Sequence, residues 1–89
     1  MKAKETLETA LELVTGDRAE QHGDMHDTHK IAADLWNAYI GDGVLTAEDV
    51  ALMLALIKIA RMRYGSENDD NYVDLAGYAA VAAEIAHAD

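Results

Sequence analysis

The chain has 89 residues, no cysteine and a net charge of -10, from 17 acidic and 7 basic side chains. A chain of this length forms one small domain, whose core buries only about 60–65% of the surface that the unfolded chain exposes. The lack of cysteine excludes disulfides and thiolate metal sites. The acidic balance argues against direct binding to nucleic acid, because a grip on phosphates requires clustered Lys and Arg.

Hydrophobic residues make up 51% of the chain, which is high for this length. We therefore expect excess apolar surface to be covered by self-association into a dimer or a larger homo-oligomer. The longest apolar run, 50–57, is far shorter than the roughly 20 residues of a membrane span. The segment 1–5 leads directly into an amphipathic pattern without the apolar stretch of a signal peptide. These features predict a cytoplasmic protein that does not bind membranes.

Two helices are predicted in the first half of the chain. Leu7, Ala10, Leu11 and Val14 follow helical spacing, which predicts a helix over 3–14. A second helix is predicted over 27–40, and the glycines of the segment 41–43 end it.

The third helix, over 47–63, begins at a capping box made by Thr46 and Asp49. It is apolar nearly all round, so we expect it in the middle of the fold. The fourth helix, over 69–87, has two apolar faces, one expected to pack on the third helix and the other on the second helix or a second subunit. The loop 64–68 is short enough to make helices three and four an antiparallel hairpin. The sequence thus predicts an all-α fold, a single four-helix domain over 1–89 with this hairpin at its centre.

Four charged residues are expected to meet at one level of the hairpin. Lys58 and Arg61 precede the loop, and Asp70 and Asp74 follow it. One interpretation is an ion-pair cluster that fixes the register of the hairpin. The other is a site in which the two aspartates hold Mg²⁺ and the two cations contact a phosphate. A third carboxylate, such as Glu48, would then have to come from another helix or subunit.

A second polar cluster comprises five residues of the segment 18–29: Arg18, His22, Asp24, His26 and His29. Imidazoles and a carboxylate are zinc ligands, although this spacing is not a specific metal signature. His29 falls on the same helical side as Trp36, which favours a packed histidine instead.

Several separated blocks resemble a small domain of unknown function from phages and prophages. They are Arg18 with His22-Gly23-Asp24, then 33–36, 45–53, 58–61 and 70–80. More loosely, this domain is similar to the nucleotide-modification-associated phage domain and to the MazG-like all-α nucleoside triphosphate pyrophosphohydrolases. The MazG resemblance implies a Mg²⁺-dependent cleavage of a nucleoside triphosphate to monophosphate and pyrophosphate. It places Asp74 at the second carboxylate motif, while the glutamate pair of the first motif is absent from 47–63.

Two hypotheses follow. In the first, the chain is a phage-type nucleotide-handling protein with Asp70 and Asp74 on Mg²⁺ and Lys58 and Arg61 on phosphate. The residues assigned to the pocket are Arg18, His22, Asp24 and Trp36. In the second, the chain is a non-enzymatic, acidic, oligomeric interaction protein that binds a host or phage protein.

Overall fold

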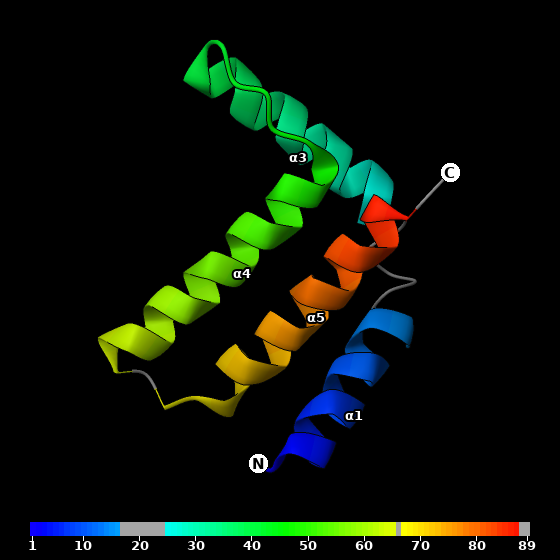
Figure 1. Cartoon of the computed structure of the whole chain (residues 1–89), viewed down its shortest axis with the longest axis vertical. Coiled ribbons are helices and arrows are strands. Elements are labelled where there is room, and N and C mark those ends of the chain that lie inside the picture. The colour runs from blue at the N-terminus through cyan, green and yellow to red at the C-terminus, as the bar shows by residue number, and fades with distance from the viewer. Residues whose placement is uncertain (17–24, 66, 88–89) are drawn as a thin grey trace.

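The computed structural model describes residues 1–16, 25–65 and 67–87. Within these ranges the chain forms four helices and no strand, which confirms the predicted all-α class (Figure 1). The helices are α1 (Ala3–Thr15), α3 (Met25–Ile40), α4 (Ala47–Tyr64) and α5 (Asp69–Ala86). None of the observed helix ends lies more than two residues from the predicted one.

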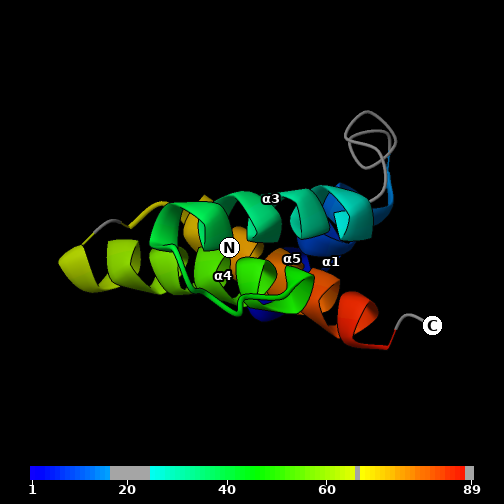
Figure 2. The same ribbon diagram turned by 90° about the horizontal axis from the view of Figure 1, so that it is seen from above.

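Three of the helices form a layer, and the fourth lies across it. The packing of α4 against α5 is the most extensive in the molecule, which confirms the antiparallel hairpin. Helix α1 packs along the other side of α5, so that α5 is the middle helix of the layer (Figure 1). Helix α3 packs on α4 and crosses the end of the layer at which α4 begins (Figure 1), as the view from above also shows (Figure 2).

Two expectations about this arrangement are wrong. Helix α4, expected in the middle, lies at an edge of the layer, and the second face of α5 is covered by α1 rather than by α3. Val14 of α1 packs beside Gly77 of α5, where an added Cβ would make an ordinary van der Waals contact at 3.6 Å from Cγ1 of Val14.

The core consists of small side chains. Ala51, Val81 and Ala82 form its central cluster, against which Val14, Met25 and Ile85 pack. The largest fully buried side chains are Val50 and Val73. The helices therefore approach each other through alanine and valine, and many leucine and isoleucine side chains stay exposed.

The predicted start of α4 is confirmed in atomic detail. The Thr46 hydroxyl accepts a hydrogen bond from the Asp49 amide at 3.2 Å, and the Asp49 carboxylate accepts one from the Thr46 amide at 2.9 Å. This capping box satisfies two amides that the helix itself cannot pair. At the other end Gly65 adopts a φ of +115°, a conformation that favours glycine and ends α4.

The connection between α3 and α4 is held by one side chain. The Asn37 amide nitrogen donates to the Leu45 carbonyl, and the Asn37 amide oxygen accepts from the Leu45 N–H, both at 2.9 Å. The Asn37 side chain thus pairs both polar groups of the Leu45 backbone and ties the end of α3 to the segment that leads into α4. Sequence reasoning did not assign Asn37 any role.

No helix among the described ranges is both long and apolar enough to cross a bilayer.

We expect Asn37→Ala to lower the free energy of unfolding by about 1–2 kcal/mol, because it leaves both polar groups of Leu45 without their partner. Asn37→Asp retains the acceptor for the Leu45 N–H but turns a carboxylate oxygen toward the Leu45 carbonyl, so it should not recover the loss. The exposed loop variant Asp42→Ala serves as the control and should leave the unfolding free energy within about 0.5 kcal/mol of wild type. Urea titration followed by circular dichroism measures all three. Equal losses for Asn37→Ala and Asp42→Ala would contradict this role.

Candidate functional site

The candidate site lies where α4 ends and α5 begins, because the short hairpin loop brings these two segments to one level. Gly65 closes α4 by donating its N–H to the carbonyls of Arg61 and Met62. Asn68 then caps α5, accepting a hydrogen bond from the Asp70 N–H at 2.9 Å. These local signals fix both helix ends. They thereby fix the position of each charged side chain along the axis of the hairpin.

Lys58 and Asp74 meet across the hairpin, as the sequence predicted. The Lys58 Nζ lies 2.8 Å from Asp74 Oδ2, and the two side chains are only 14% and 32% exposed. The aliphatic stem of Lys58 therefore lies on the packed side of α4, while its ammonium group reaches the carboxylate of the neighbouring helix. An ion pair in such surroundings is less screened by solvent than one on the open surface.

The other two members of the predicted cluster stay apart. Arg61 and Asp70 are exposed, and neither forms an ion pair with a residue inside the described ranges. Glu48, suggested as a third carboxylate, lies ten residues before Lys58, or about 15 Å along the axis of α4. Within one chain, Glu48 therefore does not join Asp70 and Asp74.

The histidine cluster is described in part, since Arg18, His22 and Asp24 lie outside the described residues. His26 is exposed, whereas His29 is buried and donates from Nδ1 to the Met25 carbonyl at 2.8 Å. Burial fits the interpretation of His29 as a packed side chain. Trp36 is half-buried on α3. Across the part of the chain that the structure describes, no three His, Cys, Asp or Glu side chains gather as metal ligands would.

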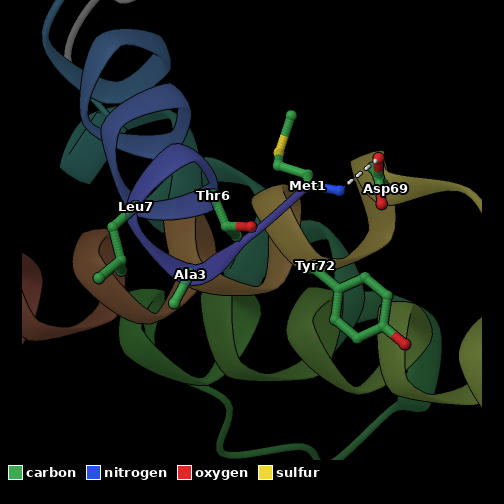
Figure 3. A pocket seen from close by; sticks show the side chains of 6 residues that line it. All are labelled: Met1, Ala3, Thr6, Leu7, Asp69 and Tyr72. Carbon is green, nitrogen blue, oxygen red and sulfur yellow. Dashed lines mark hydrogen bonds and ion pairs between the residues drawn. The ribbon is translucent and has the colours of Figure 1, made fainter.

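An open pocket lies elsewhere, between α1 and the start of α5 (Figure 3). Its lining includes none of the predicted metal or phosphate ligands and consists of Met1, Ala3, Thr6, Leu7, Asp69 and Tyr72. The Met1 amino group lies 3.4 Å from Asp69 Oδ2 at its rim. This ion pair links α1 to α5, and no spacing in the sequence indicated it.

Sequence reasoning also missed the exposed apolar residues of α4. Leu52, Leu56 and Ile59 are 45%, 61% and 40% exposed. The sequence shows a helix that is apolar nearly all round, which predicts a position in the middle of the fold and does not single out these three residues.

Comparisons with known proteins identify relatives of the chain. A family model described as "Domain of unknown function (DUF6378)" matches residues 5–86. The "Gene 55 protein" of Mycobacterium phage L5 is 45% identical over 75 residues, which cover 84% of this chain and 48% of that protein. The "Gene 55 protein" of Mycobacterium phage D29 is 33% identical over 79 residues, or 89% of this chain and 52% of that protein. The chain thus spans about half the length of these curated relatives.

No solved structure matches the chain significantly. The matches confirm the expected likeness to a phage domain of unknown function.

A double-mutant cycle on Lys58 and Asp74 should give a coupling energy of about 1–2 kcal/mol, below the value for a fully buried pair because Asp74 is partly solvated. The cycle uses Lys58→Met, Asp74→Ala and the double variant, with unfolding free energies from urea titration. Asp74→Ala should cost more than Lys58→Met, because it strands the less exposed charge.

The matched control is the pair Lys30–Asp34, whose atoms are closer, at 2.6 Å, but whose side chains are 61% and 62% exposed. We expect about 0.3–0.5 kcal/mol there, since solvent screens the pair. A coupling energy at Lys58–Asp74 no larger than in the control would show that partial burial of this pair does not strengthen its contribution to the stability of the hairpin.

Proposed function

The chain belongs to the DUF6378 family, and we propose that it acts as a non-enzymatic interaction protein that binds a basic protein through its acidic exterior. The observation that carries this proposal is the distribution of unneutralised acids on the surface. Glu5, Glu8 and Glu12 are exposed along one side of α1, and Lys4 alone pairs with one of them, Glu8, at 3.8 Å.

The other described cations offset these acids only in part. Lys30 and Lys58 pair with Asp34 and Asp74. Arg61 and Arg63 lie in the last turn of α4, and Lys2 is the N-cap residue of α1. The outer side of α1 therefore presents an excess of negative charge to any approaching partner. A surface of one sign attracts an oppositely charged protein and accelerates its association, by a factor that falls as salt is added.

To test the proposal, the tagged protein is used to capture partners from a mycobacterial extract, chosen because the relatives above come from mycobacteriophages. We expect a basic protein to be retained at low salt and lost as ionic strength approaches about 1 M, where charges are screened within about 3 Å. The triple variant Glu5→Gln, Glu8→Gln, Glu12→Gln should fail to retain it.

The control variant removes equal charge elsewhere, by Asp34→Asn, Asp42→Asn and Glu67→Gln at exposed positions. It should retain the partner. Capture that is the same for both triple variants, or that survives high salt, would contradict binding through the acids of α1.

A second candidate function is nucleotide binding with Mg²⁺, as the looser resemblance to MazG-like pyrophosphohydrolases implies. The Lys58–Asp74 contact favours it, because one predicted phosphate ligand and one predicted metal ligand lie within 2.8 Å of each other. Asp70 lies one helical turn before Asp74. Two carboxylates supply only part of the roughly six oxygen ligands of Mg²⁺, so phosphate oxygens and water would have to complete the set. In this proposal Lys58 and Arg61 contact the phosphates.

Thermal unfolding with Mg²⁺ and a panel of nucleoside mono-, di- and triphosphates tests this candidate. A nucleotide at 100 times its dissociation constant should stabilise the fold by about 2.7 kcal/mol and raise the melting temperature visibly. The shift should vanish in Asp74→Asn and persist in Asp34→Asn. If no nucleotide shifts the wild-type transition, the candidate fails and the Lys58–Asp74 pair is a structural contact alone.

A further inference from the structure

One row of residues, half-buried at Glu48 and exposed from Leu52 onward, runs the length of α4. Its members are Glu48, Leu52, Leu56, Ile59 and Arg63, separated by four, four, three and four positions. Residues at this spacing lie above one another on one side of a helix. The row borders the buried side of α4, whose residues are Ala47, Val50, Ala51 and Ala55: Ala55 follows Leu52 by three positions and precedes Ile59 by four. The row therefore lies beside the packed face of α4 and not within it.

The apolar part of this row is large and solvent-exposed in the single chain. Leu52, Leu56 and Ile59 are 45%, 61% and 40% exposed. Three large aliphatic side chains in one row form a contiguous apolar strip. Burying them in a contact would gain free energy that the single chain leaves unused.

The whole molecule also exposes more surface than a monomer of its mass. Its accessible surface is 6465 Å². A folded monomer of 9.7 kDa exposes about 5,100 Å². The excess of about 1,300 Å² belongs to the chain as a whole, since Leu7 on α1 and Leu35 on α3 are exposed as well as the row on α4. The radius of gyration, 13.8 Å, is likewise larger than the about 12 Å of a compact chain of 89 residues.

The order of residues in the row indicates which partner surface is complementary to it. The row is nearly symmetric about Leu56, with Leu52 and Ile59 as the apolar neighbours and Glu48 and Arg63 at the two ends. An identical helix in the opposite direction would place leucine against isoleucine and the acid of one copy against the base of the other. A parallel copy would instead oppose like charges at both ends. Glu48 and Arg63 have no ion pair with any other described residue, so both charges are available.

We propose that two copies of this chain associate through this row, with their α4 helices antiparallel and the two-fold axis beside Leu56. Glu48 then faces Arg63 of the partner subunit at both ends of the contact. The dimer does not depend on the binding of a basic protein, because the acids of α1 lie on a different helix.

Sedimentation equilibrium tests the proposal at tens of micromolar protein. The wild type should have twice the chain mass of 9.7 kDa. Leu56→Asp should sediment as a monomer with unchanged helical circular dichroism, because it places two carboxylates beside each other on the axis. Leu35→Asp is the matched control, since Leu35 is 65% exposed on α3 and should leave the dimer intact.

Charge exchange tests the direction of the helices. Glu48→Arg and Arg63→Glu should each weaken the dimer at least tenfold, and the double variant should restore it, because opposite charges again meet across the axis. A monomeric wild type, a dimeric Leu56→Asp variant or a failure of the double variant to recover would overturn the proposal. Capture of a basic partner, or its failure, decides none of these outcomes, because the acids of α1 lie on a different helix.

Discussion

The structure depends on the close packing of α4 on α5 through small side chains. Ala51 is completely buried in this interface, where it packs with Val81 and Ala82. Helix axes approach closely where the side chains between them are small. A small domain gains little burial to begin with, and a core of alanine and valine reduces the apolar surface that each residue removes from water. The same interface leaves no room for the leucines and isoleucines of α4, which must lie outside it.

This constraint also explains why Lys58 occupies the packed side of an otherwise apolar helix. Near the end of α4 the contact with α5 no longer encloses a side chain completely, so an ammonium group can reach the edge of the interface while its stem packs. Asp74 meets it there from α5. The pair opposes sliding of one helix along the other, because a shift by one turn would separate the two charges and leave Lys58 partly buried without its partner.

Local sequence signals were sufficient for the helices and for half of the candidate site. Thr46, Asp49 and Gly65 predict the ends of α4 through capping chemistry that depends only on neighbouring residues. Loop length and helical rise then predict the height of Lys58 and Asp74. The rotation of each helix about its axis could not be predicted in the same way, because it depends on which neighbour covers it. For this reason Arg61 and Asp70 were expected in the cluster, although both are exposed.

The position of α4 was misjudged for a related reason. A helix that is apolar all round is expected to be surrounded, but the pattern does not say whether its neighbours come from the same chain. Here α4 packs against α5 and α3, and part of its surface stays exposed. Helix α1 packs against α5 instead. Leu52, Leu56 and Ile59 are therefore exposed in the single chain, although the apolar pattern of the helix predicts that they are covered.

The two surfaces proposed for binding lie on different helices, with α5 between them (Figure 1). Contact through α4 leaves the outer side of α1 open in each copy. A two-fold dimer would then present the acids Glu5, Glu8 and Glu12 twice, at separate edges of one particle. Two weak electrostatic sites held in one molecule bind an extended basic surface more tightly than either site alone, provided that both can reach it. Self-association would in this way compensate for the low affinity that a solvent-screened acidic surface gives a single copy.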